Sequence, residues 1–205
     1  MLAVLTPYGS DSVYMQWHRR LVEIARKWSA GTMFLDNKGL KIDESREKLV
    51  KDALEGGATE ILFIDSDVIP PVNGYEMLKS HRYPIVSGAY RTKDGTGNLQ
   101  AYLKNSRGQY ERVSSIHGVG PAMADAVGLG FCWIDARVFR KLAEPWFLWG
   151  NQTLNANRVS EDLYFFQRVN DELDMRVIVD TRVSCLHMTV GAISDSGIIL
   201  AEQIQ

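Results

Sequence analysis

The sequence predicts an α/β fold in which a mostly parallel central sheet is flanked by helices and followed by a smaller mixed half. Short apolar runs alternate with stretches of helical spacing through the first 90 residues, a pattern typical of strands joined by helical crossovers. The remainder is less regular and combines short strand-like runs with two further helices. With 205 residues, 45% of them hydrophobic, the chain is long enough for one domain with a large core. We therefore expect a single domain over 1–205, with halves 1–90 and 91–205.

The first half contains three predicted strands and two predicted helices. Residues 2–5 form an apolar run that stops at Thr6-Pro7-Tyr8-Gly9, which predicts a buried strand that opens into a turn. Helical spacing follows over 12–28, and 32–35 is the second predicted strand. Asp43 or Ser45 is the expected cap of the next helix, which ends at Gly56-Gly57. The third strand, 61–64, ends directly at Asp65-Ser66-Asp67.

The second half begins with a predicted buried strand at 84–87. Two strand-like runs joined by Asn105-Ser106-Arg107-Gly108 predict a hairpin. A strand interrupted by Gly128 and Gly130 precedes a helix over about 135–142. Ser160 is the expected N-cap of a helix with Glu161 and Asp162 in its first turn, and two short strands close the pattern over 175–188.

Composition and charge exclude several classes of protein. A net charge of −2 and a pI near 6.1 do not suit a bulk nucleic-acid binder or a polybasic membrane anchor. Cys132 and Cys185 form no CxxC pair, so reduced, buried thiols are expected. The first ten residues lack the basic region of a signal peptide, and no apolar run approaches the ~18 residues of a spanning helix. A cytoplasmic protein is expected, and a homo-oligomer is compatible with the sequence.

Asp65 and Asp67 follow a strand that is expected to be buried, where two like charges are costly to desolvate. Ligands of a parallel α/β sheet bind outside the carboxyl ends of its strands, which is where this pair is expected. Two carboxylates at such a position can hold a hard divalent cation, Mg²⁺ or Mn²⁺. The alternative is a solvated loop in which Asp67 caps a turn before Pro70-Pro71.

Three further features allow both a structural and a functional interpretation. His187 near an apolar strand is more often a hydrogen-bonded structural residue, but a cation held by carboxylates needs another protein ligand. Glu161 and Asp162 suit the positive end of a helix dipole, or one of them serves as a general base. Gly128 and Gly130 form a bulge, or they let a ligand approach the backbone closely.

The order of these motifs resembles that of the GT-A glycosyltransferases, particularly small single-domain members of the family-2-like group. The segments that support this resemblance are "ILFIDSDVIPP", "GLGFCWIDARVF" and "SEDLYFFQRV", and the resemblance extends from Leu2 to about Met188. It implies a metal-dependent enzyme that moves one sugar from a nucleotide-diphosphate sugar to an acceptor hydroxyl. Residues 1–90 would bind the nucleotide sugar, and 91–205 would hold the acceptor and catalytic groups.

The resemblance also implies roles for individual residues. The donor would contact Thr6, Pro7 and Tyr8 at the base, with Asp65 and Ser66 near the nucleotide. Arg46 would lie near the nucleotide or help to fix the site. The ion, Mn²⁺ or Mg²⁺, would be bound by Asp67 and His187, with Asp65 reaching the ribose or a metal-bound water, and would act as a Lewis acid. Asp162 would deprotonate the acceptor, supported by Glu161. The polar stretch 92–98 is expected to be a flexible loop that orders when the donor binds.

The sequence departs from the family pattern in one motif, and two other classes of protein remain as alternatives. The QxxRW motif of processive synthases is absent, because "FFQRVND" lacks the tryptophan, so transfer of single sugars is expected. A haloacid-dehalogenase-type phosphatase would also place DxD after an apolar strand, but near the chain start and on strand one. The third class is a non-catalytic module that binds a sugar nucleotide or glycan on the same fold.

Overall fold

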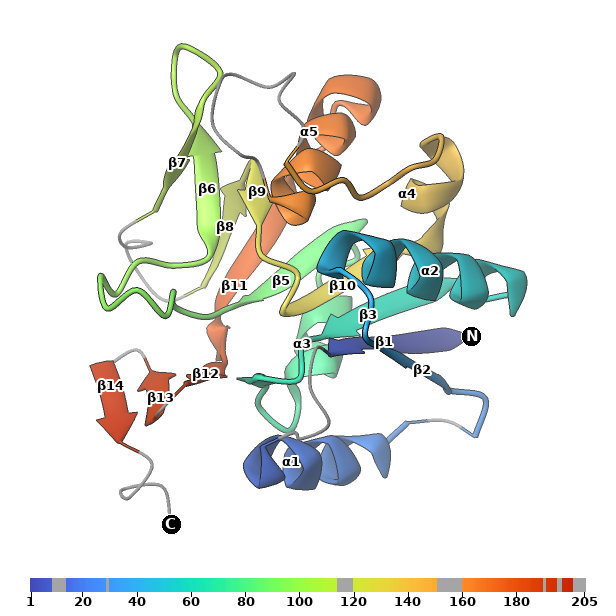
Figure 1. Cartoon of the computed structure of the whole chain (residues 1–205), viewed down its shortest axis with the longest axis vertical. Helices are drawn as coiled ribbons and strands as arrows, with labels where there is room; N and C mark the ends of the chain where they lie inside the picture. The colour runs from blue at the N-terminus through green and yellow to red at the C-terminus, as the bar shows by residue number, and fades with distance from the viewer. Residues whose placement is uncertain are drawn as a thin grey trace.

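A seven-stranded mixed sheet forms the centre of the molecule (Figure 1). The computed structural model describes residues 1–8, 14–28, 30–113, 120–150, 160–189, 191–194 and 197–200. The strand order is β2 (Met33–Lys38), β1 (Leu2–Tyr8), β3 (Glu60–Ile64), β10 (Phe131–Asp135), β5 (Ile85–Ala89), β11 (Val177–Ser184) and β8 (Pro121–Ala124). Five of these strands share one direction, whereas β10 and β8 run antiparallel to their neighbours. The prediction of a mostly parallel sheet is therefore confirmed in strand direction.

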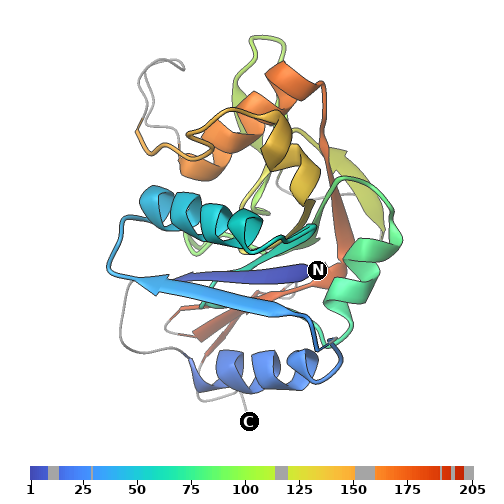
Figure 2. The same cartoon turned by 90° about the vertical axis from the view of Figure 1, so that its right-hand side faces the viewer.

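Helices cover both faces of this sheet, and alternate strand residues supply the two cores. One core contains Leu5 and Phe63 with residues from α2 (Ile42–Glu55), α4 (Ala136–Lys141) and α5 (Glu161–Leu173). The other contains Val4 and Leu62 with residues from α1 (Met15–Ala25) and α3 (Gly74–Ser80). Figure 2 shows α1 and α2 on opposite sides of the sheet. None of the described helices has both the length and the apolar character needed to cross a bilayer.

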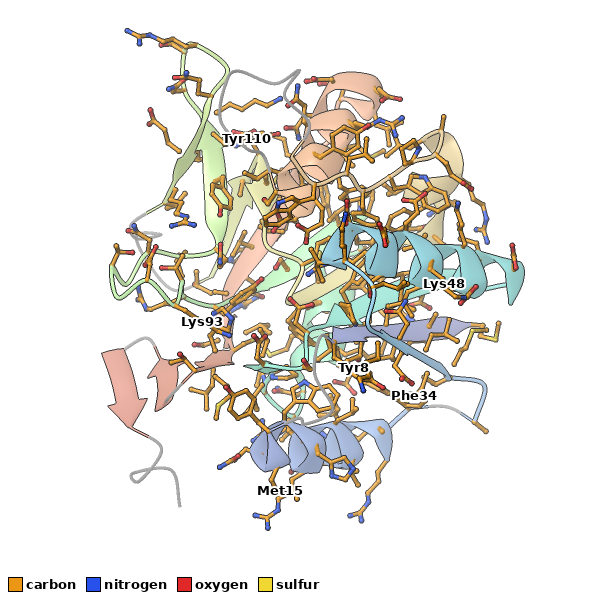
Figure 3. All side chains as sticks on the ribbon, viewed as in Figure 1. Tyr8, Met15, Phe34, Lys48, Lys93 and Tyr110 are labelled. Atoms are coloured by element: carbon orange, nitrogen blue, oxygen red, sulfur yellow. The ribbon has the colours of Figure 1, made fainter. Side chains whose placement is uncertain are left out.

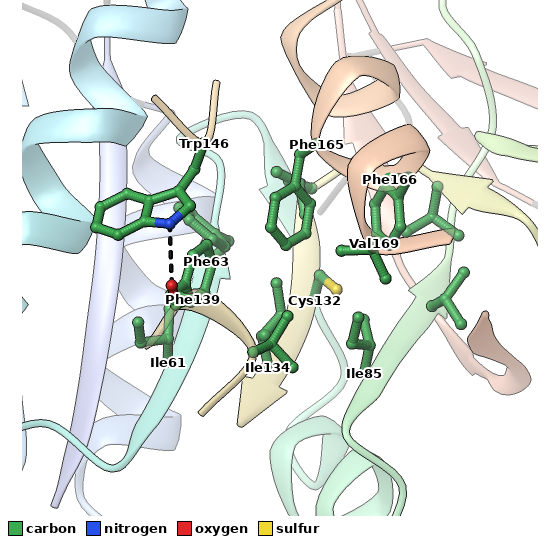
Figure 4. Packing of buried hydrophobic residues seen from close by; sticks show 14 of the residues in the cluster. Ile61, Phe63, Ile85, Cys132, Ile134, Phe139, Trp146, Phe165, Phe166 and Val169 are labelled. Carbon is green, nitrogen blue, oxygen red and sulfur yellow. Dashed lines mark hydrogen bonds between the residues drawn. The ribbon is translucent and has the colours of Figure 1, made fainter. Parts of the chain in front are cut away.

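Aromatic side chains fill the first core between the sheet and α5. Phe139 and Phe165 stack with their ring centres 5.1 Å apart. The indole nitrogen of Trp146 donates a hydrogen bond to the Phe139 carbonyl oxygen at 3.0 Å, drawn as a dashed line in Figure 4. This satisfies the polar atom of a buried tryptophan. The packing fixes α5, and with it the acids of its first turn, against the sheet.

Two small sheets complete the fold. One has the order β14 (Gly197–Leu200), β13 (Gly191–Ser194), β12 (Leu186–Met188), β4 (Val68–Ile69). The other has the order β7 (Tyr110–Arg112), β6 (Ala101–Lys104), β9 (Ala126–Val127). In the first, His187 pairs with Val68, and the Met188 N–H donates to the Asp67 carbonyl oxygen at 2.7 Å. The pairing of β12 with β4 thus brings the chain end at 186–188 beside the Asp65-Ser66-Asp67 turn.

Several local predictions are confirmed, among them the strand at 61–64, the hairpin at 105–108 and the helix that starts at Glu161. The turn predicted at residues 6–9 is wrong, because β1 continues to Tyr8. Beyond Leu5 the strand pairs with β2 but no longer with β3, so Pro7 lies where a missing N–H is tolerated. Gly9 and Ser12 lie outside the described residues.

The predicted cap of α2 is also wrong. The N-cap is Lys41, and both candidates lie inside the helix. Asp43 Oδ2 instead accepts the Trp149 N–H at 3.0 Å, and the Ser45 hydroxyl donates to the Asn37 side chain. The two halves of the chain share one sheet, because β10 from the second half lies between β3 and β5.

Candidate functional site

A cleft of about 280 Å³ lies where β1 and β3 end at the carboxyl edge of the sheet. Its lining combines residues from the end of β1, the β2–α2 connection and the first turn of α2 with polar residues that follow β3. They are Pro7, Tyr8, Leu40, Ile42, Ser45, Asp65, Ser66 and Asp67. An apolar wall therefore meets two carboxylates in one cleft.

Of the predicted base-pocket residues, Pro7 and Tyr8 line this cleft, and Thr6 is buried in β1 beside it. The Tyr8 hydroxyl, at the end of β1 in Figure 3, donates to Asp36 Oδ2 at 2.9 Å, and this bond to a carboxylate raises the pKa of Tyr8. The lining residues Leu40 and Ile42 were missed by sequence reasoning. Their signal is their place directly after a second parallel strand, whose end shares the same edge of the sheet.

Arg46 lies behind the cleft, where it holds two acids that are far apart in sequence. Its Nη2 donates to both oxygens of Asp65 at 3.1 Å each, and its Nε lies 3.3 Å from Glu161 Oε1. The arginine is 4% exposed, and its guanidinium stands 5.6 Å from the centre of the Phe63 ring. Arg46 does not line the cleft, so its position suits fixing Asp65 rather than contacting a nucleotide.

Burial governs the protonation of both acids. Desolvation raises the pKa of Asp65, against the positive charge of Arg46, and the nearby charges of Asp67 and Asp162 raise it further. Desolvation raises the pKa of Glu161 to about 7, and Arg46 opposes this shift. Glu161 is therefore the buried, proton-retaining member of the acidic pair at the start of α5.

Asp162 has a different environment, as the rotation of about 100° between neighbouring helix positions predicts. It is half-buried, accepts the Leu163 N–H at 2.8 Å and receives the Ser160 hydroxyl. Ser160 is the N-cap residue as predicted, but its side chain bonds Asp162 and makes no capping bond to the backbone. Phe165 and Phe166 are both fully buried, so the apolar face of α5 does not distinguish the two acids.

Asp67 and His187 come together although 120 residues separate them. Asp67 Oδ1 lies 3.8 Å from His187 Nε2, and His187 Nδ1 lies 2.6 Å from the Arg91 carbonyl oxygen. A carbonyl oxygen only accepts hydrogen bonds, so Nδ1 carries a proton. Burial lowers the pKa of His187, which favours the neutral ring. In this form the lone pair of Nε2 is directed toward Asp67. Two facing electron-pair donors fit a cation between them, and the Nδ1 bond to a carbonyl is typical of metal-binding histidines.

Asp65 does not join this pair, because its carboxylate contacts Arg46. Within the described part of the chain, no group of three or more His, Cys, Asp or Glu side chains surrounds one point. The predicted set of Asp65, Asp67 and His187 is thus divided between two neighbouring positions. The second oxygen of Asp67 forms an ion pair with Lys93, which lies beside β12 in Figure 3.

Tyr90 connects the glycine pair to His187. The Tyr90 hydroxyl accepts the Gly130 N–H at 2.8 Å, and its ring meets the His187 ring edge-on, with centres 5.2 Å apart. A Cβ atom at Gly128 would lie 2.3 Å from the Tyr90 hydroxyl oxygen, and one at Gly130 would lie 2.7 Å from it. Close packing against Tyr90 therefore explains why both positions are glycine, and the approach of a ligand to their backbone stays a prediction.

The loop at 92–98 lies beside the site, as expected. The Thr92 N–H donates to the Asn98 carbonyl oxygen at 2.9 Å and closes the loop. Asp94 accepts bonds from the Thr92 hydroxyl at 2.5 Å, the Thr96 N–H at 3.0 Å and Arg112 Nη1 at 2.7 Å. Ordering of this loop by a bound donor stays a prediction.

Comparison with known proteins supports the fold. No protein-family model matches the sequence, and no curated protein matches it. Among solved structures, A197 from STIV is similar at 20% identity, with a TM-score of 0.71 over 100% of this chain and 96% of that one. UDP-glucose pyrophosphorylase complexed with UDP-glucose is similar at 7% identity, with a TM-score of 0.50 over 87% of this chain and 89% of that one.

A glycosyltransferase involved in the glycosylation of the major capsid of PBCV-1 overlaps at 13% identity, covering 88% of this chain and 81% of that one. Its TM-score of 0.37 is too low to support an argument. The chain thus has a mixed α/β fold similar to that of A197 and, more distantly, to that of UDP-glucose pyrophosphorylase.

Proposed function

We propose that this protein is a divalent-cation-dependent glycosyltransferase that moves one sugar from a nucleotide-diphosphate sugar to an acceptor hydroxyl. The observation that carries the proposal is the cleft at the carboxyl edge of β1 and β3, where an apolar wall meets Asp65 and Asp67. Pro7, Tyr8 and Leu40 would contact the base, since apolar and aromatic surfaces accommodate a flat ring. The diphosphate would then lie toward the aspartates.

An acidic site repels a diphosphate unless a cation stands between them. Asp67 and His187 are the residues that would hold this ion, because the Asp67 carboxylate and the His187 Nε2 lone pair face each other at 3.8 Å. Carboxylate and imidazole ligands suit Mn²⁺, and Mg²⁺ prefers oxygen. When bound, the ion would supply Lewis-acid stabilisation of the departing nucleoside diphosphate.

The acids at the start of α5 and Arg46 have separate proposed roles. Asp162 is the proposed base for the acceptor hydroxyl, because it is half-buried, whereas Glu161 is buried against Arg46. Glu161 and Arg46 would act indirectly by orienting Asp65. The acceptor proton would pass to a carboxylate oxygen of Asp162 as the hydroxyl oxygen bonds to the sugar.

The environment of Asp65 argues against a haloacid-dehalogenase-type phosphatase. That chemistry needs the first aspartate as a free nucleophile, but both oxygens of Asp65 contact Arg46 Nη2 at 3.1 Å. A carboxylate engaged in this way is a weaker nucleophile. A non-catalytic binding module stays as an outcome of the test below.

The test incubates the protein with Mn²⁺ and a panel of uridine-, guanosine- and thymidine-diphosphate sugars, and measures release of free nucleoside diphosphate. Slow, metal-dependent release that is lost in Asp67→Asn supports the proposal. Asp171→Asn is the matched control, because Asp171 is an exposed acid near the C-terminal end of α5 that pairs with Lys104 and does not line the cleft. Donor binding without release would indicate a binding module, and phosphate release from aryl phosphates would indicate a phosphatase.

A further inference from the structure

Lys93 occupies one oxygen of the carboxylate that we propose as a metal ligand. Its ammonium contacts Asp67 Oδ2, while Oδ1 of the same carboxylate faces His187. The side chains of Lys93 and Asp67 are 35% and 32% exposed, so ions in solution reach the pair. A cation of the chain itself therefore neutralises the carboxylate that a divalent ion would bind through its other oxygen.

The two aspartates of the site are neutralised in different ways. Asp65 is held by Arg46, which is 4% exposed and fixed between two acids and an aromatic ring. Asp67 is held by a lysine on a surface loop, and a lysine side chain rotates freely about its four-carbon stem. Of these two ion pairs, the one with Lys93 can exchange its partner without unpacking the core.

The backbone around Lys93 is anchored independently of Asp67. Thr92 is buried and bonds both Asn98 and Asp94, and Asp94 also forms an ion pair with Arg112 at 2.7 Å. If the ammonium leaves Asp67, these contacts keep the backbone of Lys93 beside the cleft. The displaced charge stays within reach of an anion bound there.

We propose that Lys93 exchanges partners during donor binding: a divalent cation displaces it from Asp67, and the ammonium then binds the diphosphate of the donor. Like charges exclude the ammonium from a carboxylate that a divalent ion occupies, and the diphosphate offers the nearest new anion. This inference rests on the proposed metal and donor. It gives Lys93 two opposite effects, competition with the metal before the nucleotide binds and support of the nucleotide afterwards.

The test measures Mn²⁺ binding by electron paramagnetic resonance, without nucleotide, and then UDP and GDP binding at saturating Mn²⁺. Lys93→Gln is expected to bind Mn²⁺ at least about threefold more tightly, because a partly exposed competing ion pair is removed. The same variant is expected to bind the nucleoside diphosphate about tenfold more weakly, because a charge-assisted contact is lost. Lys93→Arg should restore most of the nucleotide affinity, since it keeps the charge.

Lys104→Gln is the matched control, because Lys104 also pairs with an aspartate. Its Nζ lies 3.1 Å from Asp171 Oδ1, and neither residue lines the cleft. Circular dichroism of each variant verifies folding. Equal Mn²⁺ affinity of the wild type and Lys93→Gln would overturn the exchange and leave the metal proposal intact. Unchanged nucleotide affinity would overturn the diphosphate contact. Absence of Asp67-dependent Mn²⁺ binding in the wild type would overturn the metal proposal and the exchange together.

Discussion

Arg46 is the residue whose removal most directly tests how the site is held. The change Arg46→Met keeps an unbranched side chain of similar length but leaves Asp65 and Glu161 without their shared cation. Removing one partner of a buried ion pair costs about 3–5 kcal/mol, because the remaining charge is uncompensated. For a chain of this size that corresponds to a fall in Tm of roughly 6–20 °C.

The loss should depend on pH in a definite direction. Arg46 lowers the pKa of Asp65 and of Glu161, so the variant raises both values further above those of the unfolded chain. A raised folded pKa contributes stability at low pH that is lost as the pH rises through it. Arg46→Met is therefore expected to lose most stability at pH 8 and least near pH 4.5.

The assay is urea unfolding followed by tryptophan fluorescence at both pH values, with Arg46→Met/Glu161→Gln as the compensating double variant. Neutralising Glu161 removes one of the two stranded charges and should recover about 1–3 kcal/mol at pH 8. Arg137→Met, which removes an arginine whose side chain is 78% exposed, should leave the midpoint almost unchanged. A loss below about 1 kcal/mol in Arg46→Met, or no recovery in the double variant, would refute the buried cluster as a stabilising unit.

Three further predictions concern other parts of the site. In the wild type, the stability that protonated Glu161 contributes is present below about pH 4.5 and is lost as the pH rises through its folded pKa of about 7. The free energy of unfolding of Glu161→Gln, compared with that of the wild type, should therefore increase by up to about 3 kcal/mol from pH 4.5 to pH 7. A difference that is the same at every pH would contradict this. Gly128→Ala should cost about 1–3 kcal/mol by overpacking against Tyr90. Tyr90→Phe alone leaves the Gly130 N–H without its acceptor. The double variant Gly128→Ala/Tyr90→Phe should lose less stability than the sum of the two single changes, because the clash with the hydroxyl is removed. Strict additivity in this double-mutant cycle would show that the clash is absent. Asp162→Asn should lower turnover about 10²–10⁴-fold at unchanged donor affinity; a larger loss in Glu161→Gln would reverse the proposed roles of the two acids.

Local pattern was sufficient to predict the scaffold and the edge of the sheet at which the cleft lies. Residues 61–64 are apolar at every position, which is how a strand buried on both faces is recognised, and all four are buried in the structure. Because parallel strands end at one edge of a sheet, the two aspartates after this strand could be placed beside the end of β1. The hairpin at 105–108 could also be predicted from the sequence, since its turn residues are adjacent in the chain.

The orientation of side chains within the site was decided by tertiary packing. Glu161 and Asp162 are neighbours with similar sequence signals, and both Phe165 and Phe166 are fully buried, so helical periodicity could not show which acid turns inward. Arg46 makes that choice from a different helix, through contacts with Glu161 and Asp65. Periodicity describes one element at a time, whereas an ion pair between elements depends on how they dock.

The same limit applies to the other contacts that define the site. The sequence by itself determined the strand, the Asp65-Ser66-Asp67 turn and the polar loop that follows β5, because each depends on adjacent residues. Only the tertiary structure showed that Lys93 pairs with Asp67 and that Tyr90 requires the two glycines. The approach of His187 to Asp67 was expected from the resemblance to a family, and the structure shows that the pairing of β12 with β4 produces it. These partners are 26 to 120 residues apart, and sheet pairing and helix packing, rather than the residues between them, bring them together.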